Sequence, residues 1–195
     1  VNLLETFEKS KQAKPLYYRT DTHWNQDGAL LASQAVAAQM RSAFAAPSWA
    51  QTRFVSESPP QPKERVGDLL TMMSMAHVPN WLRPNPDMEP KAVTRKQEES
   101  SALGLFGDVN MPVVLTGTSY SMRANFHGYL QAALETEVLN VAKDGGGFLQ
   151  SIQAYLSDDA FKSSPPKLLV WEIPERMFGQ PLTEQELALL ATANR

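Results

Sequence analysis

The sequence contains no cysteine in 195 residues. This absence excludes a disulfide framework, a thiolate metal site and a cysteine nucleophile. No apolar run approaches the ~20 residues that a membrane-spanning helix needs. The net charge is -3, so nothing indicates a nucleic-acid-binding protein, which usually presents a strongly basic face. With 43% hydrophobic and 20% charged residues, the composition predicts a folded globular domain.

The length predicts a single domain over residues 1–195. The chain begins with valine, and its first candidate motif starts near residue 20, so we expect part of the fold to precede residue 1. Residues 47–100 contain most of the prolines and are predicted to form an irregular insertion. One short helix is expected within it, over residues 67–73.

Apolar runs at residues 113–115, 137–142 and 167–173 alternate with helical patterns. One such helix is expected from about residue 122 to 133 and the next from 148 to 156. Buried strands separated by helices predict an α/β fold with a mostly parallel sheet covered on both faces.

Two further helices are marked by their termini. The first begins near Asn25 and ends before Pro47; its predicted buried stripe is Leu31, Ala35, Ala38 and Met40. In the last helix, Thr183 and Glu186 form a predicted capping box, and Leu182 with Leu187 forms a hydrophobic staple.

A serine motif, Gly117–Ser121, follows the first apolar run of the sheet. Ligands bind open α/β sheets outside the carboxyl ends of the strands. Ser119 at that place can supply a nucleophile and a backbone donor for an oxyanion. The alternative is a serine that only caps the following helix.

A serine nucleophile needs a base, and histidine suits neutral pH. The sequence has three histidines. His77 lies in the proline-rich segment and His127 about two helical turns after Ser119. His23 alone has a carboxylate, Asp21, two residues away on an expected loop, so both side chains can point to one side. The alternatives are a surface Asp–His pair, or two ligands of a metal site for which no further ligand is evident.

Other residues are candidates for oxyanion or substrate binding. Each also has a structural interpretation. Gly145 and Gly146 belong to a glycine run that either contacts a ligand or forms a flexible turn. Trp24 either stacks on a sugar or belongs to the core. Arg123 either binds an anionic sugar or is a solvated helix residue.

Glu172 and Arg176 either support the site or form a structural ion pair. Tyr120, next to Ser119, completes this set.

Three segments resemble the AlgJ/AlgX family of alginate O-acetyltransferases. They are Tyr18–Trp24, Gly117–Ser121 and Val170–Arg176, and the similarity extends over essentially the whole chain. We expect it to be closer to the AlgJ branch than to the AlgX branch, since no carbohydrate-binding module is expected after residue 195. The resemblance implies an SGNH-hydrolase-like, flavodoxin-like α/β/α sandwich, circularly permuted because Asp-x-His precedes the serine.

The resemblance also implies roles and surroundings. Ser119 is the expected nucleophile, His23 the base and Asp21 the orienting carboxylate, with no cofactor and no metal. The expected substrate is alginate, an exopolysaccharide of biofilms. Acetyl is expected to arrive through a membrane-bound acyltransferase in the periplasm, and association with the inner membrane is a further expectation. Ordinary members place an oxyanion asparagine after the third strand; here Pro174–Arg176 stands there, so a glycine of 145–147 is favoured as second donor.

Two other functions fit the same residues. A carbohydrate acetylesterase would use the same triad and give free acetate. A non-catalytic polysaccharide-binding or scaffold protein would have no activity that depends on Ser119.

Overall fold

The computed structural model describes residues 1–44, 51–97, 111–147 and 149–193. The chain forms two compact units. The first comprises Val1–Glu98 and Arg123–Thr136, and the second comprises Glu99–Met122 and Glu137–Arg195. The chain therefore passes from the first unit to the second, returns for one short segment and then ends in the second.

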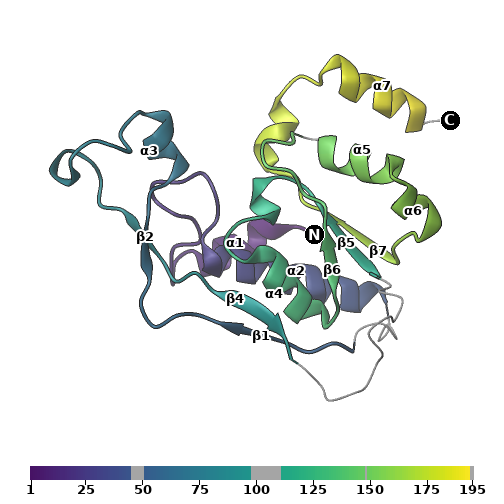
Figure 1. Cartoon of the computed structure of the whole chain (residues 1–195), viewed down its shortest axis with the longest axis horizontal. Helices are drawn as coiled ribbons and strands as arrows, with labels where there is room; N and C mark the ends of the chain where they lie inside the picture. Colours follow the sequence, from purple (N-terminus) through teal and green to yellow (C-terminus); the bar gives the residue numbers. More distant parts are fainter. Residues whose placement is uncertain (45–50, 98–110, 148, 194–195) are drawn as a thin grey trace. The chain divides into compact units, whose positions relative to one another are not determined.

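The first unit is built around two helices, α2 and α4, that pack side by side (Figure 1). Its core is mainly alanine from α2 and Phe126, Leu130 and Leu134 from α4. The helices of this unit are α1 (Leu3–Ser10), α2 (Gln26–Ala43), α3 (Asp68–Met72), the 3-10 helix η1 (Asn80–Leu82) and α4 (Phe126–Leu134).

Helix α2 confirms the predicted start, because the Asn25 side chain accepts a hydrogen bond from the Gly28 N–H at 3.0 Å. Of the predicted buried stripe, Met40 is buried and Leu31 and Ala35 are half-buried, but Ala38 is exposed, so that part of the prediction was wrong. The buried residues include Ala29, Ala32, Ala37 and Met40. Alanine recurs all around this helix, so its hydrophobic pattern alone does not determine which face is turned inward.

The proline-rich segment is not irregular, contrary to the expectation. It contains two antiparallel ribbons, and the short helix predicted near residue 67 is α3. The prolines lie between these strands, where no ladder hydrogen bond is lost. The ends of the expected insertion, 47–50 and 98–100, fall outside the described residues. The ribbons pair β1 (Phe54–Glu57) with β4 (Val93–Lys96), and β2 (Lys63–Arg65) with β3 (Asp87–Glu89).

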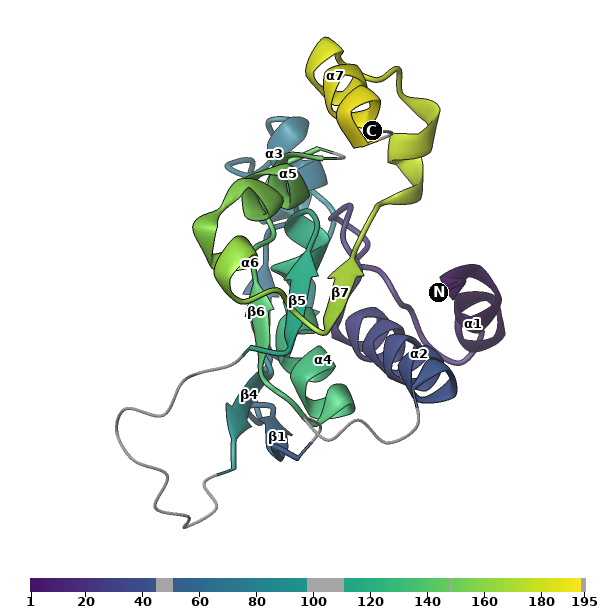
Figure 2. The same ribbon diagram turned by 90° about the vertical axis from the view of Figure 1, so that its right-hand side faces the viewer.

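The second unit contains a parallel three-stranded sheet, as the sequence predicted. Strand β5 (Val113–Thr116) lies between β6 (Val138–Asn140) and β7 (Leu168–Trp171), as Figure 2 shows. Every residue of β5 is buried, which explains its unbroken apolar run. Ser151 on α5 (Gln150–Ser157) bonds to the backbone of Gly117 just after β5, so this helix is fixed at the carboxyl end of the central strand.

The chain after β5 differs from the expected helix of residues 122–133. Only one 3-10 turn, η2 (Ser119–Ser121), follows the strand. Ala124 and Asn125 then adopt positive φ angles of 54° and 58°, which interrupts the helical hydrogen bonding. Helix α4 begins only at Phe126. Met122, predicted to be on a buried face, is 54% exposed.

The structure describes three further helices in the second unit, one between β6 and β7 in the chain and two after β7. The capping box of the last helix is confirmed, because Thr183 and Glu186 exchange hydrogen bonds. Within the described residues, no helix combines the length and apolarity that crossing a bilayer requires. The elements are α6 (Asp159–Ser163), the 3-10 helix η3 (Glu175–Gly179) and α7 (Glu184–Ala193).

The central strand provides a test of the core of the second unit. Leu115 is 0% exposed, so Leu115→Ala is expected to lower the free energy of unfolding by about 2–5 kcal/mol. Leu169→Ala, on the adjacent β7 and 37% exposed, is the matched control and should cost clearly less. Denaturant titration measures both; equal losses would contradict the burial of β5.

Candidate active site

The loop that carries Asp21 and His23 is closed by its own backbone. Tyr17 and Trp24 form an isolated antiparallel bridge, and the Tyr18 N–H donates to the His23 carbonyl. This tight reversal brings the two side chains together. Asp21 Oδ1 lies 2.5 Å from His23 Nδ1 and also accepts the His23 backbone N–H at 3.0 Å. Both side chains are buried, at 1% and 6% exposure.

Arg65, at the end of β2, binds the other oxygen of Asp21. Its Nε and Nη2 both donate to Asp21 Oδ2, at 3.1 and 2.7 Å. The guanidinium also lies 4.7 Å from the centre of the Tyr18 ring and contacts Glu89 at 3.4 Å. The Tyr18 hydroxyl donates to Glu89 at 2.9 Å. The buried charge of Asp21 is thus part of a closed network of partners.

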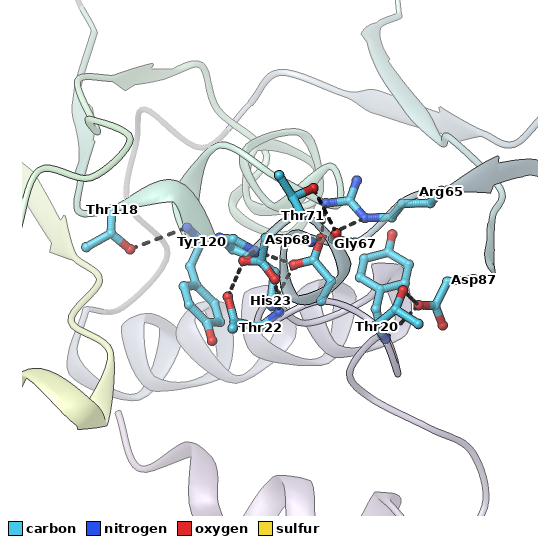
Figure 3. Close-up of polar contacts among 12 residues, drawn as sticks. Thr20, Thr22, His23, Arg65, Gly67, Asp68, Thr71, Asp87, Thr118 and Tyr120 are labelled. Atoms are coloured by element: carbon cyan, nitrogen blue, oxygen red, sulfur yellow. Dashed lines mark hydrogen bonds and ion pairs between the residues drawn. The ribbon is translucent and has the colours of Figure 1, made fainter. Parts of the chain in front are cut away.

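A second carboxylate, Asp68 at the start of α3, contacts the loop that carries Asp21 and His23 (Figure 3). It accepts the backbone N–H and the hydroxyl of Thr22, at 2.7 and 2.5 Å, and lies 3.5 Å from His23 Nδ1. Its own N–H donates to Asp21 at 3.3 Å. Gly67 permits this approach, because a Cβ there would collide with the Thr20 carbonyl.

These contacts determine the protonation of Asp21. Burial alone would raise the pKa of its carboxyl. The hydrogen bonds from His23 and Arg65, together with the positive charge of Arg65, outweigh burial and hold the pKa well below its usual range. Burial, reinforced by the negative charge of Glu89, raises the pKa of the Tyr18 hydroxyl. Asp21 is therefore a permanent anion, suited to fix the tautomer of His23 and stabilise an imidazolium.

The geometry also groups Asp21, His23 and Asp68 as possible metal ligands, with donor atoms within 4.8 Å of one another. Asp68, the third residue, was not predicted from the sequence. The arrangement fits hydrogen bonding better than a cation. The short contact between Nδ1 and Asp21 requires a proton on that nitrogen, and the other oxygen of Asp21 is already bonded to Arg65.

The serine loop of the second unit is fixed by Glu172, the residue that follows β7. One carboxylate oxygen, Oε2, accepts the Thr118 N–H at 2.8 Å, the Thr118 hydroxyl at 2.9 Å and the Ser121 hydroxyl at 3.1 Å. Gly117 allows this approach, since a Cβ there would lie 2.6 Å from the same oxygen. These bonds flank Ser119 on both sides.

Ser119 is the first residue of η2 and is 7% exposed. The capping role belongs to its neighbour, because the Thr118 hydroxyl accepts the Tyr120 N–H (Figure 3). Ser119 therefore need not serve as the cap, the alternative that the sequence left open. Its contact with His23 would join the two units and stays a prediction.

The glycines and Trp24 were each given a ligand-binding and a structural interpretation from the sequence. Gly145 and Gly147 have positive φ angles, and the Gly146 N–H donates to the Lys143 carbonyl. This bond disfavours Gly146 as an oxyanion donor and leaves Gly145. Trp24 is 4% exposed and its ring packs 4.9 Å from that of Phe126, which favours the core interpretation over stacking on a sugar.

The two arginines differ in position. Arg123 lies in the bend before α4, half-buried, so it is neither on a helix nor fully solvated as the alternative assumed. Arg176 donates to the Tyr120 hydroxyl at 3.3 Å, and its guanidinium lies 5.4 Å from the centre of that ring. Glu172 and Arg176 do not form the ion pair that the sequence left open, since Glu172 binds Thr118 and Ser121.

Sequence reasoning missed the residues of the proline-rich segment that support Asp21 and His23. A signal was present: Asp87 and Glu89 are spaced two apart, as are Lys63 and Arg65, which places each pair on one face of a strand. Asp87 accepts from the backbone and hydroxyl of Thr20. Glu89 is 9% exposed and binds Tyr18 and Arg65.

A small parallel sheet with a serine loop at its carboxyl edge is the architecture of SGNH-hydrolase-like domains. Residues 1–175 match the family described as "SGNH hydrolase-like domain, acetyltransferase AlgX". The chain belongs to this family.

Individual relatives agree with this assignment. The probable alginate O-acetylase AlgJ of Azotobacter vinelandii is 37% identical over 179 residues, which cover 90% of this chain and 46% of the relative. The alginate biosynthesis protein AlgX of Pseudomonas syringae pv. tomato is 31% identical over 191 residues, covering 96% and 39%. The chain thus spans about half the length of the curated relatives it matches.

Solved structures show the same fold. The O-acetyltransferase domain of Pseudomonas putida AlgJ superimposes with a TM-score of 0.75 at 32% identity, covering 98% of this chain and 66% of that one. Pseudomonas aeruginosa AlgX gives a TM-score of 0.65 at 27% identity, covering 88% and 44%.

The buried charge of Asp21 predicts acid sensitivity. Its folded pKa lies below the unfolded value of about 3.9, so the carboxylate stabilises the fold fully above that value and less as the pH falls toward the folded pKa. Asp21→Asn should cost about 3 kcal/mol near pH 7, because Arg65 keeps only the more distant carboxylate of Glu89, and the difference from the unmodified protein should shrink below about pH 4.

Unfolding titrations between pH 7 and pH 3 measure this difference. Asp159→Asn is the control, since that side chain is 98% exposed and should matter little at any pH. A cost of Asp21→Asn that is the same at pH 3 and pH 7 would show that folding does not lower the pKa of this carboxyl.

The Glu172 network predicts a second effect on stability. Glu172→Ala leaves three donors of Thr118 and Ser121 without this acceptor and should cost about 2–3 kcal/mol. Glu172→Gln keeps one acceptor oxygen and should recover part of the loss. Glu175→Ala, at an exposed position three residues on, should be nearly neutral. A neutral Glu172→Ala in denaturant titration would refute the role of this carboxylate.

Proposed function

We propose that this chain is the catalytic domain of an alginate O-acetyltransferase that carries acetyl on Ser119. The observation that supports this most is the buried Asp21–His23 hydrogen bond, which leaves the second ring nitrogen, Nε2, as the base. Family membership and the matched relatives, probable alginate O-acetylases, supply the reaction class and the acceptor. The chain order, Asp-x-His before serine, favours a circularly permuted three-layer α/β/α sandwich.

The first half-reaction acetylates the serine. His23 Nε2 takes the Ser119 proton as Oγ attacks the acetyl carbonyl of the donor. The Ser119 backbone N–H and that of Gly145 are the proposed donors to the oxyanion, each worth about 3–4 kcal/mol. The bond to the donor then breaks, and its leaving group takes the proton from His23.

The second half-reaction transfers the acetyl group. A hydroxyl of the polysaccharide attacks the acetyl carbonyl, its proton passes to His23, and Ser119 Oγ leaves and takes that proton back. Water in place of the sugar gives hydrolysis, so the esterase alternative differs only in the acceptor. With this assignment we also propose that the protein acts in the periplasm, with acetyl supplied by a membrane-bound acyltransferase.

An activated ester tests the nucleophile directly. Incubation with p-nitrophenyl acetate should add one acetyl group, a mass increase of about 42 Da, because general-base help from His23 speeds the attack of Ser119 roughly 10²–10⁴-fold. Mass spectrometry of the intact protein measures this increase. Peptide mapping should locate the group on Ser119. Ser119→Ala should abolish it and His23→Gln should slow it by about the same factor, whereas Ser163→Ala, on exposed α6, should react normally.

Adding oligomannuronate to the acetylated protein then separates transferase from esterase. Acetylated sugar is the expected product; free acetate alone at every acceptor concentration would favour the esterase. Acetylation at another residue, or none in the presence of donor, would refute Ser119 as the nucleophile.

A further inference from the structure

Tyr120, the residue after the proposed nucleophile, is in contact with the guanidinium of Arg176. Arg176, in η3, extends to Tyr120, with Nη1 donating to the phenol oxygen at 3.3 Å and the guanidinium 5.4 Å from the ring centre. Tyr120 is 8% exposed, so the ring is fixed in the protein. The arginine itself is exposed. The contact with Tyr120 orients the guanidinium while leaving its other N–H groups available.

Among the residues of its unit that the structure describes, none neutralises the charge of Arg176. In the described part of the chain, no carboxylate lies within ion-pair distance of this guanidinium. Glu172, which follows β7, is engaged by Thr118 and Ser121. Glu175, which directly precedes Arg176, is exposed and forms no ion pair with it in the described part of the chain. An arginine that is oriented by an aromatic ring and has no carboxylate partner is suited to bind a carboxylate in a planar, two-bond geometry.

We propose that Arg176 binds the carboxylate of the uronate residue that accepts acetyl at Ser119. The inference rests on the proposed function, which supplies the acceptor. It adds the group that distinguishes a polyuronate from a neutral polysaccharide. Tyr120 links the two sites, because it follows Ser119 in the chain and bonds to Arg176 through its hydroxyl.

The location supports an acceptor site at this edge of the sheet. Ser119 follows the carboxyl end of β5, and Arg176 lies a few residues beyond the carboxyl end of the adjacent parallel strand β7. Ligands of open parallel sheets bind at this edge. A chain with a net charge of -3 repels a polyanion on average, so binding a uronate requires a local cation at the acceptor position.

The test measures transfer to oligomannuronate with Arg176→Gln. Loss of a charge-assisted pair should raise KM by about ten- to hundredfold, with the effect on KM rather than kcat. Arg176→Lys keeps the charge without the planar fork and should fall between. Lys167→Gln removes an exposed cation at the amino end of β7 and should leave KM unchanged, which controls for general attraction of the polymer.

A matched acceptor sharpens the result. Oligomannuronate with its carboxyl groups methyl-esterified should show the raised KM with the unmodified protein, and Arg176→Gln should add nothing further. Equal sensitivity of both acceptors to Arg176→Gln, or the same loss in Lys167→Gln, would overturn the proposal.

Calorimetric binding of oligomannuronate to Ser119→Ala provides a readout that needs no turnover. The Arg176→Gln change in that background should weaken binding by the same factor as it raises KM. Unchanged binding would overturn the role of Arg176 even where acetylation of Ser119 is established. Weakened binding without acetylation of Ser119 would instead support Arg176 and refute the proposed chemistry.

Discussion

The candidate site depends on one buried negative charge, that of Asp21. An isolated carboxylate with a 1% exposed side chain would be too costly to keep ionised. Here each oxygen has donors: His23 on Oδ1, and Arg65 with the Asp68 N–H on Oδ2. This distribution leaves Asp21 charged. The carboxylate can then accept a hydrogen bond from a protonated Nδ1 of His23, so that Nε2 becomes the basic nitrogen. The local fold of the loop and its chemistry have the same cause.

The serine loop is organised by the same principle from a different element. Glu172 concentrates three donors on one oxygen, and Gly117 supplies the space for that oxygen. In both loops a carboxylate is held by backbone N–H groups and side chains that are themselves well ordered. Such preorganisation matters for catalysis, because a reacting group that needs no rearrangement loses no free energy to it in the transition state. Ser119 lies between two residues that Glu172 holds in place.

Local patterns predicted the loop and the strands; long-range contacts could not be predicted. The Asp21–His23 spacing needs only a tight reversal, and the fully buried β5 reads as an apolar run ending in glycine. Arg65 and Asp68 reach Asp21 from more than forty residues away in the sequence, and the prolines of this segment suggested irregular structure. The buried face of α2 was predicted only in part for a related reason. Which alanines face inward depends on packing against α4, and the sequence of α2 alone carries no information about that contact.

Discrimination between sugar and water is the remaining requirement of an acetyltransferase. Water is always more concentrated than a polymer end or chain residue, so the acceptor hydroxyl must be held near the acetyl-serine to compete. A positioned carboxylate contact achieves this by converting an encounter into a near-unimolecular step, which is worth several orders of magnitude in effective concentration. Arg176 contacts Tyr120, the residue that follows the proposed nucleophile. In the mechanism that we propose, this oriented cation favours transfer over hydrolysis in the same way that it favours uronates over neutral sugars.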